Sequence, residues 1–208
     1  MNAPTHPQEL ALQKVEFKLD GKTIVSYEGE TILKAAKRHG IDIPHLCFKD
    51  GYRPDGNCRA CVVEINGERT LAPSCCRSAT PGMEVKANSE RALKSQKLVL
   101  EMLLSDMPDE GFKWVGNSTA EEQKNQHGEL STWASRMDVT VRPELKALRR
   151  EPVTKDVSHP AMAVNLDACI QCNRCVRACR EEQVNDVIGY AMRGAHSEII
   201  FDLNEPIG

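Results

Sequence analysis

The sequence has few aromatic residues, no long hydrophobic run and no strong excess of either charge. Aromatic residues make up 4% of its 208 residues, whereas nine residues are cysteine, so we expect small units supported by metal. No segment approaches the roughly 18 apolar residues of a membrane span. Residues 1–10 contain two prolines and no apolar stretch, so we do not expect a signal peptide.

The formal net charge of −3 argues against binding of nucleic acid, and no basic stripe indicates a membrane surface. No glycine-rich phosphate loop follows a predicted strand, and no Ser/His/Asp arrangement stands out. We therefore expect no catalytic residue and no nicotinamide or flavin site within these residues. Thiols stay reduced and available for metal in the cytosol, so we predict a cytoplasmic protein.

The first cysteine group begins at Cys47. The gaps between its successive members are ten, two and thirteen residues. The close pair forms a chelate loop that brings two thiolates to one metal centre. The turn residues 55–57 before this pair are small, so backbone N–H groups can approach bridging sulfides. The pattern predicts a [2Fe–2S] site with four ligands: Cys47, Cys58, Cys61 and Cys75.

Other interpretations of this group remain open. Four cysteines also form structural zinc sites, and in an oxidising compartment they would form disulfides. Cys76 competes with Cys75 for the last position; we favour Cys75 and expect Cys76 to be a small packed thiol. His45 suggests a Rieske centre, but such a centre needs two histidines in place of two cysteines. We therefore expect His45 beside the site or on the surface.

This group resembles the [2Fe–2S] domain at the amino end of three kinds of protein. They are the large peripheral subunit of complex I, iron-only hydrogenases and NAD-dependent formate dehydrogenases. The matching stretches are 44–47 (PHLC), 56–64 (GNCRACVVE) and 73–75 (PSC). A plant-type loop differs, with a shorter first gap and a more distant fourth cysteine.

The residues before the first group predict a hairpin and a helix. Residues 15–19 and 24–27 alternate apolar and polar side chains on either side of Asp20-Gly21, which is typical of a hairpin. Thr31 is a suitable N-cap for a helix through Arg38. Strand, strand, helix and then a cluster loop is the order of a β-grasp ferredoxin.

The residues after the close cysteine pair predict the rest of the sheet. Residues 62–65 and 69–71 flank Asn66-Gly67 and should form a second hairpin. Residues 83–86 should close the small sheet.

A longer helix is predicted from its N-cap Ser89 to about Ser105, with a buried face formed by Leu93, Leu100, Leu103 and Leu104. In large members of the resembling family this helix leads into a further cluster, bound by His-x3-Cys-x2-Cys-x5-Cys. The four corresponding positions hold residues that cannot ligate in the usual way: Met107, Gly111, Trp114 and Ala120. We expect the chain to keep the scaffold and to lack that centre.

The region that follows carries weaker signals. Short helices are predicted over 121–126 and 143–150, and an extended linker over 151–160. The basic residues at the end of the second helix are expected to be solvated charge: Lys146, Arg149 and Arg150.

The second cysteine group has the spacing C-x2-C-x2-C-x3-C, which is typical of the [4Fe–4S] site of bacterial ferredoxins. The two-residue gaps return the thiolates of Cys169, Cys172 and Cys175 to one centre. Cys179 follows about one helical turn later, and in two-cluster ferredoxins such a cysteine binds the adjacent cluster. Four arginines near the two groups either tune the clusters or are plain surface charge: Arg59, Arg174, Arg177 and Arg180.

A second run of this kind, which would return one ligand to the first cubane, is absent before Gly208. Three explanations are open: the chain continues, Cys179 bends back to complete the site, or a partner supplies a ligand. We favour the first, because residues 199–202 are typical of a strand that leads into more protein. The isolated chain is then expected to hold its [4Fe–4S] cluster poorly.

With residues 175–189 included, the chain resembles the alpha (catalytic) subunit of cytoplasmic NAD-dependent formate dehydrogenase over about residues 14–208. The resemblance implies a relay between a Mo/W-bis-pterin site, further along the same polypeptide, and a flavin- and NAD-binding beta subunit with its gamma subunit. FMN and NAD belong to the wider complex. Nothing in these residues could bind the pterin or formate.

The predicted fold class is α+β. A flexible leader (1–13) precedes a β-grasp [2Fe–2S] domain (14–88), a helical connector (89–160) and a ferredoxin-like [4Fe–4S] unit (161–208). Two other functions remain open. The chain could be an electron-transfer subunit of a hydrogenase or a complex I-like assembly, or a zinc-stabilised interaction scaffold without redox chemistry.

Overall fold

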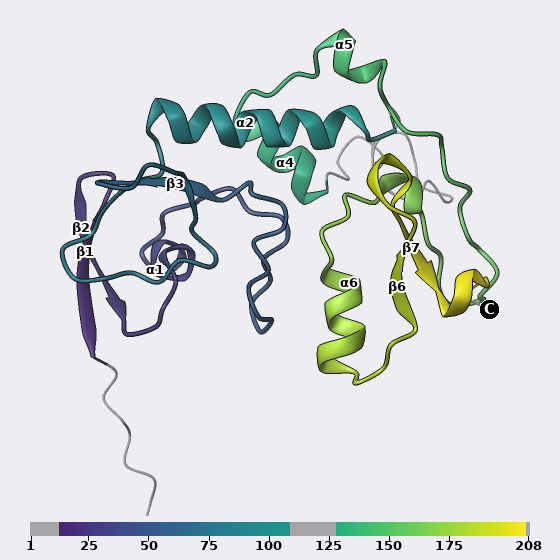
Figure 1. The fold of residues 1–208 in the computed structure, drawn as a ribbon, viewed down its shortest axis with the longest axis horizontal. Coiled ribbons are helices and arrows are strands. Elements are labelled where there is room, and N and C mark those ends of the chain that lie inside the picture. Colours follow the sequence, from purple (N-terminus) through teal and green to yellow (C-terminus); the bar gives the residue numbers. More distant parts are fainter. Residues whose placement is uncertain (1–12, 109–127, 207–208) are drawn as a thin grey trace, which may run out of the picture.

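The computed structural model describes residues 13–108 and 128–206. Figure 1 shows a lobe that contains the main sheet, a smaller C-terminal lobe, and helix α2 (Glu90–Ser105) running from the first lobe toward the second. The chain is a mixed α+β protein, as the sequence predicts.

The first two strands form the predicted hairpin. β1 (Lys14–Leu19) pairs antiparallel with β2 (Lys22–Tyr27), and Leu19 lies opposite Lys22. The two loop residues, Asp20 and Gly21, have φ values of 49° and 82°, as a type I′ turn requires. The Asp-Gly signal in the sequence is therefore confirmed.

The main sheet has five strands in the order β2-β1-β5-β3-β4. β5 (Glu84–Lys86) lies at its centre, parallel to β1 and antiparallel to β3 (Val62–Ile65). The prediction of a strand over 69–71 is wrong. β3 pairs instead with the two-residue strand β4 (Ala72–Pro73), which follows directly after those residues. The Asn-Gly signal placed the reversal correctly, but the connection between the strands is longer than a tight turn.

Helix α1 (Ile32–Arg38) supplies the layer that covers the sheet. Thr31 caps it, because its Oγ1 accepts a hydrogen bond from the Lys34 backbone N–H at 3.4 Å. The apolar side of the helix is completely buried together with the inner faces of the strands, including Phe17 and Val85. This core makes a rigid base for the loop that carries Cys47 to Cys61.

Helix α2 begins after its predicted cap, Ser89, and ends at Ser105. Its buried stripe differs from the prediction: Ala92, Gln96 and Leu100 are buried, whereas Leu93 and the leucines of the last turn are only partly buried. Gln96 was missed because a polar side chain enters a core only when its hydrogen bonds are satisfied, and sequence periodicity does not reveal the acceptors.

The connector contains α4 (Glu129–Arg136), which the sequence analysis did not predict, and α5 (Pro143–Lys146), which is shorter than predicted. Met107 is buried in an apolar cluster with Leu46 and Leu100. At this position the family that the sequence resembles has the histidine ligand of a further cluster, whereas here the side chain packs in a core. Gly111, Trp114 and Ala120, like the helix predicted over 121–126, lie outside the described residues. The predicted linker carries one isolated bridge, between Asp156 and Val164.

The C-terminal lobe contains short helical turns and one hairpin. β6 (Ile188–Ala191) and β7 (Glu198–Phe201) form an antiparallel two-stranded sheet, so the strand predicted over 199–202 exists and has a partner. The helical turns are η1 (Leu166–Ala168), α6 (Arg174–Arg177), η2 (Ala178–Glu182), η3 (Gly194–His196) and η4 (Asp202–Asn204). None of the helices within the described ranges has the length and apolar character that a membrane crossing needs.

Candidate metal centres

The four cysteines predicted for the first site come together at one end of the main sheet. Cys47, Cys61 and Cys75 are at most 1% exposed, and Cys58 is partly buried. The Cys47 thiol hydrogen-bonds with the thiols of Cys58 and Cys75, and Cys75 also bonds with Cys61. The structure therefore unites all four predicted ligands of this group.

The contacts among these thiols favour negative charge on two of the four sulfurs, those of Cys47 and Cys61. Hydrogen bonds from Cys58 and Cys75 lower the pKa of Cys47 to about 2, and a hydrogen bond from Cys75 lowers the pKa of Cys61 to about 7. The same contacts raise the pKa of Cys58 and Cys75 above the usual thiol range. The Cys47 backbone N–H also points at the Cys58 Sγ, at 3.4 Å. Since the thiolate is the form that binds metal, the donor set fits an iron–sulfur cluster.

Each two-residue gap between cysteines contains one residue in the left-handed backbone region. Arg59, between Cys58 and Cys61, has φ 59°, and in the second group Gln171 and Asn173 have φ 52° and 64°. This conformation is unfavourable for residues with a Cβ atom. The resulting sharp turns return successive side chains toward the same side. The spacing predicted this return of the thiols, but nothing in residue type predicted left-handed Arg59 or Gln171.

The structure distinguishes Cys75 from Cys76. Cys75 is fully buried, and the preceding Ser74 donates to the Cys61 carbonyl oxygen at 2.7 Å, which ties the two arms of the site together. Cys76 is exposed, so the expectation of a packed thiol is wrong. Its sulfur lies beside Gly56, where an added Cβ would meet it at 3.0 Å.

Three cysteines of the second group lie close together in the C-terminal lobe. Burial of Cys169, and partial burial of the sulfur of Cys175 in a residue that is exposed as a whole, raise the pKa of these two thiols. Repulsion among the thiolates of Cys169, Cys172 and Cys175 adds to the effect. Tyr190 lies beside them: burial first, then these thiolates, raise its pKa to about 12, and its hydroxyl donates to the Gln171 carbonyl oxygen at 3.1 Å. The donor set fits a cluster that takes three ligands from this loop.

Cys179 is directed elsewhere. It is 6% exposed, lies in η2, and its Sγ donates to the Asn185 carbonyl oxygen at 3.0 Å. The structure thus separates Cys179 from the other three cysteines in its bonding.

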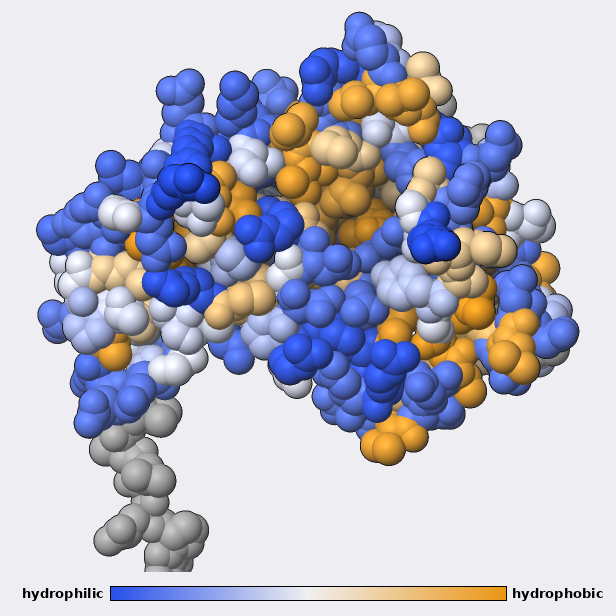
Figure 2. Space-filling view, viewed as in Figure 1, coloured by the Kyte–Doolittle hydropathy of each residue, from blue (hydrophilic) through white to orange (hydrophobic). Residues whose placement is uncertain are grey.

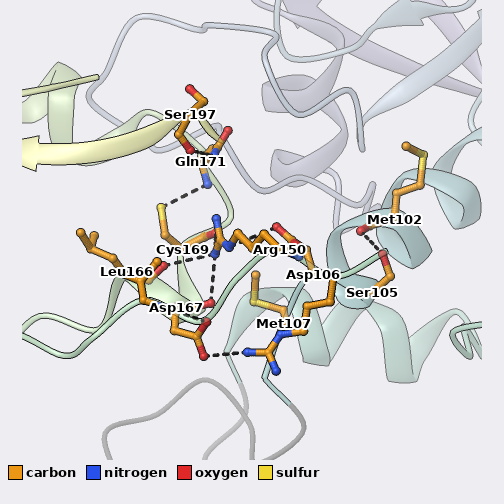
Figure 3. A network of polar contacts seen from close by, with 12 residues as sticks. Met102, Ser105, Asp106, Met107, Arg150, Leu166, Asp167, Cys169, Gln171 and Ser197 are labelled. Carbon is orange, nitrogen blue, oxygen red and sulfur yellow. Dashed lines mark hydrogen bonds and ion pairs between the residues drawn. The ribbon is translucent and has the colours of Figure 1, made fainter. Parts of the chain in front are cut away.

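Arg150 organises the backbone that leads into Cys169 (Figure 3). One of its nitrogens donates to the carbonyl oxygens of Leu166, Asp167 and Cys169, at 3.2, 3.0 and 2.8 Å. Its side chain is 14% exposed and also pairs with Asp106 at 3.3 Å. The expectation of solvated charge is therefore wrong for Arg150. It is wrong as well for the neighbouring Arg149, which pairs with the Asp167 carboxylate at 2.7 Å. Sequence reasoning had no signal for the three carbonyl acceptors of Arg150, because they belong to the backbone.

An apolar groove of about 1450 Å³ lies next to this network, and the hollow is visible in Figure 2. Leu103 of α2, Leu148, Ile170 and Met192 contribute to its walls. Cys169 also lines it. The second cysteine group therefore borders an open surface on this side.

Helix α6 and the loop before it contact the Cys47–Cys58 loop through polar bonds. Arg177 donates to the carbonyl oxygens of Cys47 and Arg53. The Asn57 side chain donates to the Gln171 carbonyl oxygen at 2.8 Å, so the bonds run in both directions. The sequence left open whether the arginines near the two groups are plain surface charge. Arg177 is buried, so it is not surface charge, whereas Arg180 is exposed beside Asp186.

His45 lies beside the first site. Its Nδ1 is 2.8 Å from the Ile43 carbonyl oxygen, and the centre of its ring lies 5.8 Å from that of Phe48 and 6.0 Å from that of Trp133. Within the described ranges, no three His, Cys, Asp or Glu side chains are arranged around a position for a single metal ion. The Cys75 thiol contacts those of Cys47 and Cys61, and also that of the neighbouring Cys76, at 3.5 Å.

Comparison with known families identifies the first of these sites. Residues 13–90 match the model of a 2Fe-2S iron-sulfur cluster binding domain. This segment is a ferredoxin-type [2Fe–2S] domain. The match includes all four cysteines that the structure brings together.

Relatives of the whole chain are subunits or parts of redox enzymes. The NADP-reducing hydrogenase subunit HndD of Solidesulfovibrio fructosivorans is 38% identical over 85% of this chain and 29% of its own length. The NADH dehydrogenase [ubiquinone] iron-sulfur protein 1 of Solanum tuberosum is 30% identical over 89% of this chain and 24% of its own. The putative formate dehydrogenase YrhE of Bacillus subtilis is 26% identical over 94% of this chain and 19% of its own length.

The chain therefore spans less than a third of the length of these curated relatives. Among solved structures, a chain of an NAD+-reducing [NiFe]-hydrogenase in the H2-reduced state is similar, with a TM-score of 0.72 and 25% identity. That similarity covers 93% of this chain and 79% of the hydrogenase chain. The likeness thus includes the connector and the C-terminal lobe as well as the [2Fe–2S] domain.

Proposed function

We propose that this chain is the iron–sulfur electron-transfer module of an NAD(P)-linked oxidoreductase. The observation that carries the proposal is the direct contact between the two cysteine groups, made by buried Arg177 on α6 and the Cys47 carbonyl oxygen. Two redox sites held against each other in this way suit a relay. We expect no catalytic residue beside them.

We assign Cys47, Cys58, Cys61 and Cys75 as ligands of a [2Fe–2S] cluster, and Cys169, Cys172 and Cys175 as ligands of a [4Fe–4S] cluster. Bound clusters would supply reversible one-electron acceptance and donation. Cys179 is assigned to an adjacent centre, supported by its separate hydrogen bond to Asn185. The open groove beside Cys169 leaves room for further protein to bring the missing ligand.

The protein's own contribution is burial, charge and fixed geometry. Burial of Cys47, Cys61 and Cys75 keeps water from the first site, and burial together with hydrogen bonds to sulfur sets the potential of such centres. Arg150 fixes the backbone at Cys169 through three carbonyl oxygens. These groups act on the ligands and perform no bond chemistry themselves.

For the electron donor we propose formate. The resemblance at residues 175–189 supports it, and the similarity to a putative formate dehydrogenase of Bacillus subtilis agrees with it. A Mo/W-bis-pterin site would then lie outside these residues, and FMN and NAD would be bound by a beta subunit with its gamma subunit. We place the assembly in the cytoplasm, where the nine free thiols remain available for metal.

A hydrogenase is the second candidate, favoured by two specific observations. The NADP-reducing hydrogenase subunit has a higher identity, 38%, than the formate dehydrogenase-like relative, at 26%. The similar solved chain is likewise from an NAD+-reducing hydrogenase. The purified native complex separates the two candidates: formate-dependent reduction of NAD(P)+ supports the first, and hydrogen-dependent reduction supports the second.

The relay itself is tested on the 208-residue chain, purified without oxygen. We expect iron together with acid-labile sulfide, and an EPR signal of a reduced [2Fe–2S] centre after addition of dithionite. A weaker [4Fe–4S] signal should accompany it. A colourless protein that contains only zinc would refute the proposal and support a zinc-stabilised scaffold.

A further inference from the structure

Arg177 is the most deeply buried charged side chain of the C-terminal lobe. It is 4% exposed and lies on α6, two residues after Cys175 and two before Cys179. It therefore comes from within the second cysteine group, yet its guanidinium makes its hydrogen bonds in the loop of the first.

Two carbonyl oxygens of that loop receive the guanidinium. One Nη atom donates to the Cys47 carbonyl oxygen at 2.5 Å, and the other donates to that of Arg53. One turn earlier on α6, Arg174 donates to the Phe48 carbonyl oxygen at 2.9 Å. Two arginines of one helical turn thus hold the carbonyl oxygens of two successive peptide bonds, Cys47–Phe48 and Phe48–Lys49.

The positive charge of Arg177 is incompletely balanced by the described residues. The nearest carboxylate belongs to Asp55, at 3.9 Å from Nε, and Nε has no hydrogen-bond partner in the described part of the chain. The Tyr52 ring lies 6.0 Å from the guanidinium carbon. A buried charge without a close counter-ion is costly. A cluster bound by four thiolates carries negative charge, which increases on reduction, and it would supply the missing counter-charge.

Resting on the function proposed above, we propose that Arg177 is a positioning residue that links the two redox sites. It fixes the Cys47 arm of the first site against the helix of the second. Its buried charge also stabilises the reduced form of the first site and so raises the reduction potential of that site.

The test is a redox titration of the full chain, followed by the EPR signal of the [2Fe–2S] centre. The variants are Arg177→Met, which removes the charge and keeps most of the side-chain volume, and Arg177→Lys, which keeps the charge but loses the paired donors. Arg180→Gln is the matched control, because Arg180 lies one turn further along and its side chain is 59% exposed.

In Arg177→Met we expect the ratio of reduced to oxidised first site, at a fixed solution potential, to fall about tenfold. This change corresponds to a downward shift of about 59 mV for a one-electron couple. Arg177→Lys should shift the potential less, and Arg180→Gln should not shift it measurably. A lower cluster occupancy of the first site in Arg177→Lys would report the lost contact with the Cys47 backbone.

An unchanged potential and occupancy of the first site in both Arg177 variants would overturn the inference. If Arg177→Met does not fold, Arg177→Lys decides alone, and wild-type potential and occupancy in that variant count against the inference. Failure of the proposed function looks different, because the wild-type chain itself would then hold no iron and sulfide.

Discussion

The side-chain nitrogen of Gln96 lies 2.8 Å from the carbonyl oxygen of Val62. The same nitrogen also reaches the Ala87 carbonyl oxygen, at 3.2 Å. Val62 is the first residue after Cys61, so this buried amide fastens α2 to the strand that leaves the close cysteine pair. Support for the first metal site thus comes from a helix outside the loop that carries its ligands.

Gln96→Met should destabilise the protein by about 1–3 kcal/mol, because two buried carbonyl oxygens lose their donor. Urea unfolding of the metal-free chain, followed by circular dichroism, measures the free energy of unfolding. Lys94→Met on the exposed side of the same helix is the control and should change it by less than about 0.5 kcal/mol. Equal stabilities of the two variants would show that the amide bonds are energetically unimportant.

Cys75→Ala should abolish the [2Fe–2S] signal, whereas the adjacent Cys76→Ala should leave it intact. The reason is that Cys75 is fully buried among the other thiols and Cys76 is exposed. Iron content and EPR of the dithionite-reduced variants provide the measurement. Loss of the signal in Cys76→Ala with retention in Cys75→Ala would reverse the assignment.

Arg150→Met should reduce the [4Fe–4S] content strongly and leave the [2Fe–2S] content close to that of the wild type. The side chain holds three carbonyl oxygens at the entrance to Cys169 and none in the first site. Arg193→Met is the control, because exposed Arg193 borders the same groove. Mössbauer spectra of iron-57-labelled protein quantify both clusters, and equal loss of the two would indicate general unfolding instead.

Cys179→Ala should change the [4Fe–4S] signal of the 208-residue chain much less than Cys172→Ala does. The Cys179 thiol hydrogen-bonds to the Asn185 carbonyl oxygen, away from the other three cysteines. We expect the wild-type chain alone to hold this cluster poorly, because the described residues group only three cysteines at this site. A fully occupied, air-tolerant [4Fe–4S] signal that disappears in Cys179→Ala would show that Cys179 completes the site.

Much of the first domain could be predicted because its signals are local. The Asp20-Gly21 loop needs two residues with positive φ, and the N-caps Thr31 and Ser89 act within their own first turns. The grouping of the cysteines likewise followed from spacing, because the short gaps constrain where the thiols point. Strand β4 was misplaced because only two residues pair, too few to give an alternating pattern.

The supporting residues could not be predicted for a related reason. The backbone carbonyl oxygens that receive Arg177 and Arg150 lie up to 130 and 19 residues away along the chain. Every residue has a main-chain carbonyl oxygen, whatever its side chain. Residue type therefore carries no information about which carbonyl accepts the hydrogen bond. The identity of Gln96 as a core residue was hidden in the same way.

The parallel pairing of β1 with β5 has a consequence for biosynthesis. Lys18 lies opposite Glu84, so the central strand of the sheet arrives 66 residues after its partner, when every cysteine of the first group has already been made. Until then the sheet beside these thiols lacks its central strand. The sheet beside the first cysteine group can therefore be completed only after Lys86 has left the ribosome. Iron and sulfide that reach the growing chain earlier would meet an unfinished site.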